Sequence, residues 1–346
     1  MAFLDLENVR IAGFSAGIPK KVVKTKSRNP KYSDEEYIKN VGVEEKHIDD
    51  KFTTSDLCYY AAEQLISDLK WDKAEIDAII FVSQFRDYIL PATAPILQDR
   101  LGLSKECYAS DISLGCSGWV YGLSSLASLM TTGSIKKGLL LVGDAKRVQD
   151  SSSNDPLFGY AGCVTALEYD KGNDGLKFHF GSDGSGYDAI IIPDGGARNG
   201  FTADSLIVSE DEDGIKRSRL NSVMKGMDVF SFAISTAPKS IKKLAQKHDI
   251  ELEKVNYLLL HQANLKINQL IQKKLKFEDE RVLNSLSHFG NTSSASIPMS
   301  IIANTSKNTF KSEKTFMACG FGVGLSWGSV YFKLKDCVIS KIVEVE

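Results

Sequence analysis

The chain has 346 residues, of which 43% are hydrophobic and 25% charged, enough to bury the core of one or two globular domains. Its 42 basic and 44 acidic residues give a net charge of -2 without a long basic run, which argues against nucleic acid as a partner. The N-terminus lacks a signal-peptide pattern and the six cysteines form no CxxC pair, so we expect a cytoplasmic protein with reduced thiols.

Strand and helix patterns alternate in the first half of the chain. Residues 55–70 are amphipathic with Ser55 as the candidate cap, and residues 91–101 predict a helix that begins at Pro91. Short apolar runs rich in branched side chains predict three buried strands, at 78–83, 138–142 and 164–169. This alternation favours an α/β fold in which helices cover both faces of the sheet.

The segment DISLGCSGWVYG, residues 111–122, places Cys116 among small residues that allow close approach. Residues 112–135 contain no charge, and their Gly, Ser and Thr content predicts a helix packed against protein, not a membrane span. We expect Cys116 in the first turn of that helix, where the helix dipole favours the nucleophilic thiolate. A buried structural cysteine is the alternative that this segment leaves open.

The second half repeats the alternation after a stretch rich in Gly, Asp, Ser and Asn at 170–223, which predicts loops or an insertion centred on 194–222. Helices are predicted at 228–248 and 265–275, and strands at 255–260, 314–318 and 329–333. Each half then carries a reactive residue type at the C-terminal end of a strand, where open α/β sheets bind ligands.

Two polar residues of the second half stand at such positions. His261 ends the strand at 255–260, and Asn291 lies in the turn GNTSSASIP, residues 290–298, which enters another helix near Pro298. Taken singly, His261 is more often structural, and Gly-Asn-Thr is an ordinary turn. Only in combination with Cys116, at separations of 145 and 30 positions, do they indicate a site. No spacing of His, Cys and Asp indicates a metal site.

The chain resembles the β-ketoacyl-acyl carrier protein synthase III family of the thiolase superfamily. The resemblance rests on the sequence around Cys116, on HQAN at 261–264, on GNTS at 290–293 and on GFGVGLSWG at 320–328. It covers nearly the whole chain in order. It implies a five-layered αβαβα fold of two similar halves, residues 1–172 and 173–346, in a homodimer without nucleic-acid or membrane partners.

The resemblance also implies a decarboxylating condensation. Cys116 would take an acyl group from acyl-coenzyme A or acyl-carrier protein, and malonyl-acyl carrier protein would lose carbon dioxide and attack the acyl-Cys116 thioester. His261 and Asn291 would stabilise the developing enolate. The N–H groups of Cys116 and of the Gly322–Gly324 loop would stabilise the acyl oxyanion. Phe321 would form an apolar wall. Coenzyme A and phosphopantetheine thioesters are then substrates, and no permanently bound cofactor is implied.

Four further residues match family positions. Lys266 matches a site of carrier-protein docking, Asn264 would orient the site, Leu90 would reach the acyl pocket across the dimer, and Tyr37 would stack on coenzyme A.

Departures from the family pattern suggest a specialised relative. Tyr37 stands near the position of a tryptophan, residues 151–155 lack an arginine expected there, and Val323 replaces the middle glycine of the loop. Two other functions remain open: an acyltransferase that moves the acyl group from Cys116 to an alcohol or amine with His261 as general base, and a non-catalytic chain-length factor.

Overall fold

The two sheets of the fold are built from corresponding strands. The computed structural model describes residues 2–27, 32–145, 156–210, 214–306 and 310–346. The first sheet contains β2 (Val9–Pro19), β5 (Ala78–Val82), β6 (Tyr108–Ile112), β7 (Lys137–Gly143) and β8 (Gly162–Tyr169). The second contains β9 (Leu176–Ser182), β14 (Tyr257–Leu260), β15 (Val282–Leu283), β16 (Lys314–Gly322) and β17 (Ser326–Leu334).

The strand order is the same in both sheets: β2-β8-β7-β5-β6 in the first and β9-β17-β16-β14-β15 in the second. Among the five strands of each set, the second in chain order, β5 or β14, pairs in parallel with two neighbours, and the other pairs within the set are antiparallel. This correspondence makes the chain two structurally similar halves.

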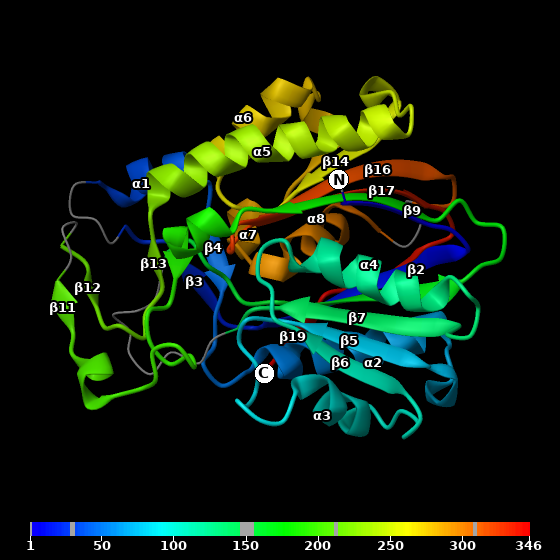
Figure 1. The fold of residues 1–346 in the computed structure, drawn as a ribbon, viewed down its shortest axis with the longest axis horizontal. Coiled ribbons are helices and arrows are strands. Elements are labelled where there is room, and N and C mark those ends of the chain that lie inside the picture. Colours follow the sequence, from blue (N-terminus) through cyan, green and yellow to red (C-terminus); the bar gives the residue numbers. More distant parts are fainter. Residues whose placement is uncertain (1, 28–31, 146–155, 211–213, 307–309) are drawn as a thin grey trace.

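Helices form three further layers around the sheets (Figure 1). The central layer holds α4 (Gly118–Met130) and α8 (Ser296–Asn304), which contact strands of both sheets. The outer layers are α2 (Thr54–Leu69) with α3 (Thr93–Arg100), and α5 (Gly226–Lys247) with α6 (Leu265–Leu275). The predicted five-layered αβαβα fold is thereby confirmed.

The two ends of the chain exchange between the halves. The N-terminal strand β1 (Ala2–Leu6) pairs with β9 in the second sheet. The C-terminal strands β18 (Val338–Ile339) and β19 (Val343–Val345) pair with β2 in the first. The predicted boundary between residues 172 and 173 falls between β8 and β9 and stays a prediction, because both ends cross it.

The stretch 170–223 is only partly the loop region that its composition indicates. Its first part forms β9, which lies inside the second sheet between β1 and β17, so a loop was the wrong expectation there. The tetrapeptide Lys177–Phe180 alternates polar and aromatic residues, and Phe178 is fully buried. The remainder extends from the body as an arm (Figure 1), which is closed by a bidentate ion pair between Arg219 and Asp194 at 2.8 Å.

Smaller elements complete the described chain. The helices are α1 (Asp34–Val41) and α7 (Leu286–Phe289). The short strands form three ladders: β3 (Val22–Lys24) with β4 (Glu45–His47), β10 (Ile190–Ile191) with β13 (Val223–Met224), and β11 (Ser209–Glu210) with β12 (Lys216–Arg217). The ladders β10–β13 and β11–β12 belong to the arm.

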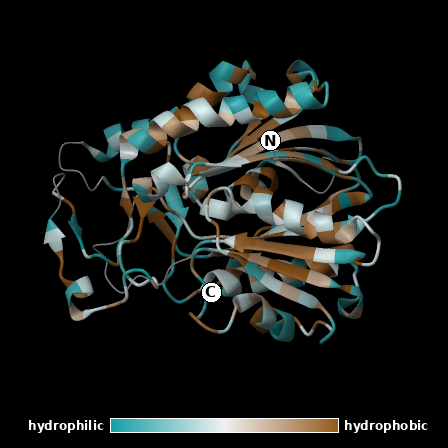
Figure 2. Cartoon of the chain, viewed as in Figure 1, coloured by the Kyte–Doolittle hydropathy of each residue, from teal (hydrophilic) through white to brown (hydrophobic). Residues whose placement is uncertain are grey.

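The uncharged segment of residues 112–135 begins at the last residue of β6 and contains α4. Figure 2 shows apolar strands flanking the central layer, with hydrophilic residues on the outward faces of α5 and α6. Trp119 is fully buried, and its indole N–H donates to Thr165 at 3.0 Å. Gly122 lets α4 lie close to the first sheet, since a Cβ there would sit 2.6 Å from Leu140. Among the helices of the described residues, none combines the length and apolar character needed to cross a bilayer.

Two helix starts differ from the predictions. Thr53, not Ser55, caps α2 in a capping box with Asp56, and the Ser55 hydroxyl donates to Asp87 at 2.7 Å. Helix α3 begins at Thr93, two residues after Pro91, because the carboxylate of Asp111 on β6 accepts from the N–H groups of Thr93 and Ala94, both at 2.7 Å. A cap from a neighbouring strand was not visible in the local sequence.

Replacing the Asp111 carboxylate should therefore destabilise the fold. We expect Asp111→Ala to lower the free energy of unfolding by about 1–3 kcal/mol, because two N–H groups of α3 lose their acceptor. Urea unfolding measures this. Asp99→Ala, on the exposed side of the same helix, is the control and should change it by about 0.5 kcal/mol or less. Equal stabilities for the two variants would contradict the capping role.

Candidate functional site

The C-terminal ends of strands from both sheets meet at Cys116. Cys116 follows β6, and β16 ends at Gly322 directly against it. A Cβ built on Gly322 would lie 2.6 Å from Cys116 Cβ and 3.0 Å from its Sγ, so only glycine leaves this sulfur its space. Strand β16 continues four residues beyond the predicted end at residue 318, which brings Phe321 and Gly322 into the site.

The loop after β16 is tied to the segment that carries Cys116. The Ser117 and Ser326 hydroxyls lie 2.7 Å apart, and Ser326 donates to the carbonyl of Val323 at 2.8 Å. The backbone N–H groups of Cys116 and Val323 both point at the Cys116 sulfur. Two such donors beside one reacting sulfur are the arrangement that an oxyanion at an acyl-cysteine requires.

Asn291 is fixed at both its backbone and its side chain. Its N–H donates to the carbonyl of Leu157 at 2.9 Å, and its carbonyl accepts from Gly159 at 3.2 Å. The side-chain Oδ1 accepts from the N–H of Ser293 at 2.9 Å. That bond distinguishes the amide oxygen from the amide nitrogen, so Nδ2 remains as the hydrogen-bond donor of the Asn291 side chain.

His261 follows β14 and is 2% exposed. Its Nδ1 lies 2.8 Å from the hydroxyl of Ser296, which also accepts from the N–H of Gln262 at 3.3 Å. We assign the Ser296 proton to Nδ1, which places the ring proton on Nε2. Burial lowers the pKa of His261 to about 3, partly opposed by the Ser293 carbonyl, so the imidazole is neutral at physiological pH.

The thiol of Cys116 does not rest as the thiolate that its helical position predicts. Cys116 lies two residues before Gly118, the first residue of α4. Burial raises the pKa of Cys116 to about 12, and the Asp144 carboxylate adds to the rise. The Ser293 hydroxyl and the N–H groups at the sulfur oppose it only in part. Desolvation therefore outweighs the helix dipole.

Phe321 lies beside His261, as the resemblance implies. The two rings meet edge to face, with centroids 5.6 Å apart and an interplanar angle of 84°. Phe321 is 2% exposed, so it places apolar surface against the imidazole. Val323 and Gly324, which follow it, are partly or fully exposed at the edge of the site.

Four other predicted residues lie outside this cluster. The Asn264 side chain caps α6 by accepting from the N–H of Ile267 at 2.9 Å, and Lys266 is exposed in the first turn of that helix. Leu90 is 85% exposed, and Tyr37 is half-buried on α1. The segment 151–155, in which an arginine was expected, lies outside the described residues.

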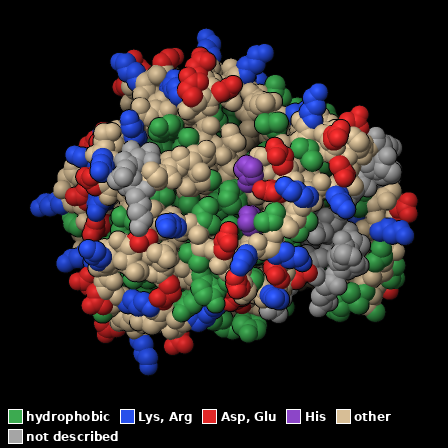
Figure 3. Space-filling view, turned by 180° about the vertical axis from the view of Figure 1, so that it is seen from behind, with side chains coloured by type: hydrophobic (Ala, Val, Ile, Leu, Met, Phe, Trp, Pro, Cys, Tyr) green, Lys and Arg blue, Asp and Glu red, His purple; other side chains and the backbone are tan. Residues whose placement is uncertain are grey.

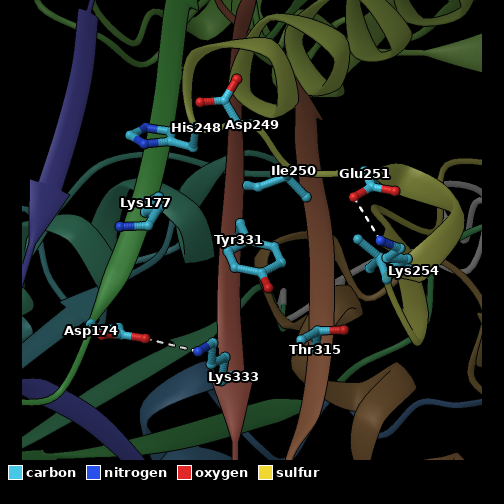
Figure 4. Close-up of a pocket in the computed structure, with 12 residues that line it drawn as sticks. Asp174, Lys177, His248, Asp249, Ile250, Glu251, Lys254, Thr315, Tyr331 and Lys333 are labelled. Carbon is cyan, nitrogen blue, oxygen red and sulfur yellow. Dashed lines mark hydrogen bonds and ion pairs between the residues drawn. The ribbon is translucent and has the colours of Figure 1, made fainter.

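A surface pocket of about 380 Å³ lies elsewhere (Figure 4). Its lining includes Thr315 near the start of β16, about 20 Å from Gly322 at a strand rise of about 3.3 Å per residue. Two ion pairs lie in its lining, Lys333 with Asp174 at 2.8 Å and Lys254 with Glu251 at 2.7 Å. The pocket contains none of the predicted site residues. Figure 3 shows basic and acidic side chains interspersed on the face opposite to that seen in Figure 1.

Sequence reasoning assigned no role to three side chains that the structure brings to the site. Ser293 and Ser296 lie in the quoted GNTSSASIP turn, and Asp144 directly follows β7. A carboxylate immediately after a buried parallel strand is the signal that was available for Asp144. The hydroxyls gave no such signal, because serine is ordinary in turns.

Comparisons with known proteins agree with this geometry. The family model of 3-oxoacyl-[acyl-carrier-protein] synthase III matches residues 110–184, and that of its C-terminal part matches residues 245–334. The first match contains Cys116 and the second contains His261, Asn291 and Phe321.

Individual relatives cover almost the whole chain. The β-ketoacyl-[acyl-carrier-protein] synthase III of Clostridium perfringens strain SM101 is 31% identical over 336 residues, which is 95% of this chain and 100% of the relative. A putative 3-oxoacyl-[acyl-carrier-protein] synthase 3 of Campylobacter jejuni is 33% identical over 314 residues, covering 88% and 86%. The crystal structure of a 3-oxoacyl-(acyl-carrier protein) synthase from Burkholderia xenovorans LB400 has a TM-score of 0.89 at 33% identity and covers 99% of both chains.

Matching family models, relatives above 30% identity over most or all of their length and a shared fold lead to one conclusion: the chain belongs to the 3-oxoacyl-[acyl-carrier-protein] synthase III family of condensing acyltransferases.

Proposed function

We propose that Cys116, His261 and Asn291 carry out the condensation in two stages. In the first, the Cys116 sulfur attacks an acyl thioester and releases the donor thiol. The N–H groups of Cys116 and Val323 bind the oxyanion that forms at the acyl carbon, since both point at the reacting sulfur. Coenzyme A or carrier-protein phosphopantetheine supplies the acyl thioester as a substrate, and the step needs no permanently bound cofactor.

In the second stage, malonyl-acyl carrier protein loses carbon dioxide and its carbanion attacks the acyl-Cys116 thioester. Negative charge moves onto the malonyl thioester oxygen, which the Nε2–H of His261 and the Nδ2–H of Asn291 stabilise. The observation that carries this role is the bond from the Ser293 N–H to Asn291 Oδ1, because it turns the amide donor outward. Phe321 presents an apolar surface that favours loss of the carboxylate charge.

The acyltransferase alternative needs His261 as a general base. A ring whose pKa burial lowers to about 3 accepts a proton poorly at neutral pH, whereas a neutral Nε2–H donor is what enolate stabilisation requires. Non-catalytic support of another enzyme would not need two oriented donors beside a cysteine. The electrostatics of His261 therefore favour condensation.

We further propose how substrates reach the site. Lys266 is exposed on α6 and offers a positive charge to an acidic carrier protein. Helix α1 packs against α6 and carries Tyr37, which would contact the adenine of coenzyme A in place of the usual tryptophan. These altered contacts support a specialised acyl donor, used by a cytoplasmic enzyme.

A homodimer is proposed from the loop before α3. Tyr88, Ile89 and Leu90 are 61%, 82% and 85% exposed, although all three are apolar and adjacent in sequence. A second copy of the chain would cover them, and Leu90 would then border the acyl pocket of the partner.

The condensation is tested by incubating the enzyme with malonyl-carrier protein and a mixed panel of acyl-coenzyme A primers. We expect mass spectrometry of the carrier protein to show a 3-oxoacyl product extended by two carbons, which also identifies the preferred primer. Cys116→Ala should form neither adduct nor product, whereas Cys107→Ala, which removes a half-buried thiol elsewhere, should form both. An acyl adduct on Cys116 without extension would favour the acyltransferase.

Removing the amide of Asn291 should separate the two stages. We expect Asn291→Ala to keep acylation of Cys116 and to lower carbon dioxide release from malonyl-carrier protein by about 10²–10³-fold, because one oxyanion donor is lost. Asn291→Asp should be no better, since a carboxylate repels the enolate. Release of labelled carbon dioxide at the parent rate would refute the assigned role.

The proposed dimer predicts a mass of twice 38.0 kDa by sedimentation. Ile89→Asp should shift the protein toward the monomer, because a charge at the centre of the exposed apolar loop opposes its burial. A parent protein that sediments as a single chain would contradict the dimer.

A further inference from the structure

Ser293 contacts all three residues of the proposed site. Its hydroxyl lies against the Cys116 sulfur, its N–H donates to Asn291 Oδ1 at 2.9 Å, and its carbonyl faces the His261 ring. Ser293 has φ +52°, a left-handed conformation that is uncommon for a residue with a side chain. Such a conformation persists where surrounding contacts hold it.

The contact that holds the Ser293 side chain is a bond to Asp144. The Ser293 hydroxyl donates to Asp144 Oδ2 at 2.5 Å. The other carboxylate oxygen accepts from the Ser83 hydroxyl at 2.7 Å and from the Gln84 N–H at 2.8 Å. These donors fix the direction of the Ser293 bond: its proton points to Asp144, so its oxygen lone pairs are left to face the Cys116 S–H.

We propose that Ser293 and Asp144 form a proton relay that activates Cys116 for acylation. As the sulfur attacks the acyl thioester, the S–H bond breaks and its proton passes to Ser293 Oγ, whose own proton passes to Asp144. The donor's carbon–sulfur bond then breaks, and the departing thiolate takes the proton back along the same path. This inference rests on the proposed function, and within it Ser293 is a catalytic residue and Asp144 a positioning residue that acts through Ser293.

Cys116 requires such an acceptor. Its thiol rests protonated because burial raises its pKa to about 12, and His261 is a poor base. Partial burial raises the pKa of Asp144 to about 6, although the bonds from Ser293 and Ser83 limit the rise. The carboxylate, which is the accepting form, is therefore present above about pH 6 and is lost as the pH falls below it.

Among the described residues, few titratable groups interact with Asp144. The thiols of Cys116 and of Cys58 on α2 interact with the carboxylate directly. The His261 ring is linked to Asp144 only through Ser293. Both thiols have a raised pKa and stay protonated near pH 6. Titration of Asp144 should thus appear in the pH profile of acylation as a single step.

The test is the rate of Cys116 acylation by the preferred acyl thioester, measured by protein mass spectrometry in single turnovers between pH 5 and 9. We expect the parent rate to rise through about pH 6 and then level. Asp144→Asn and Ser293→Ala should each be about 10²-fold slower or more at pH 7 and should lack the step. Ser293→Ala keeps the N–H that holds Asn291.

A purely electrostatic role of Asp144 predicts the opposite result. Its charge raises the pKa of Cys116, so its removal alone would yield more thiolate and faster acylation. Equal or faster acylation by Asp144→Asn would therefore overturn the relay. Alkylation of Cys116 by iodoacetamide at pH 9, where hydroxide replaces the relay, should be no slower in Asp144→Asn, because the charge that raises the Cys116 pKa is gone, and this result would show that the site is intact. A parent enzyme that forms no acyl adduct would instead refute the proposed function.

Discussion

The packing of α4 between two sheets is the constraint on which the site depends. A helix packed between two sheets must be uncharged on its packed faces and must carry small residues where strands approach it, and α4 meets both conditions. Its position fixes the residues that precede it, so Cys116 is held where strands of both sheets end. Gly322 then has to be glycine, because β16 reaches the same point from the other sheet.

Burial of this kind sets the chemistry as well as the geometry. Away from water, an isolated thiol keeps its proton and an imidazole stays neutral. In the proposed reaction those two effects suit different stages: the neutral imidazole would donate a hydrogen bond to the enolate, whereas the thiol would need a proton acceptor to become a nucleophile. Neutral hydrogen bonds orient the donors of the site: Ser296 contacts the His261 ring and the Ser293 N–H holds the Asn291 amide.

Local patterns in the sequence predicted what local forces determine. Helix α6 has the predicted bounds of residues 265–275, and β5, β7 and β14 lie within two residues of their apolar runs. Strand β2 was missed because small residues dilute its pattern; Gly17 is required by α2, where a Cβ would lie 2.2 Å from the Leu57 carbonyl. The Asp111 cap, the contacts of Asp144 and the protonated state of Cys116 all arise from residues distant in sequence, which no local pattern records.

The exchange of the chain ends between the two sheets bears on the biosynthesis of the protein. Strand β2 is completed along one edge only by β18 and β19, which are synthesised after all the other strands of the two sheets, whereas β1 is synthesised long before its partner β9. The first sheet therefore keeps an unpaired strand edge until β18 and β19 have been translated. Pairings of such long sequence separation form slowly, so the nascent chain needs protection from aggregation over that interval.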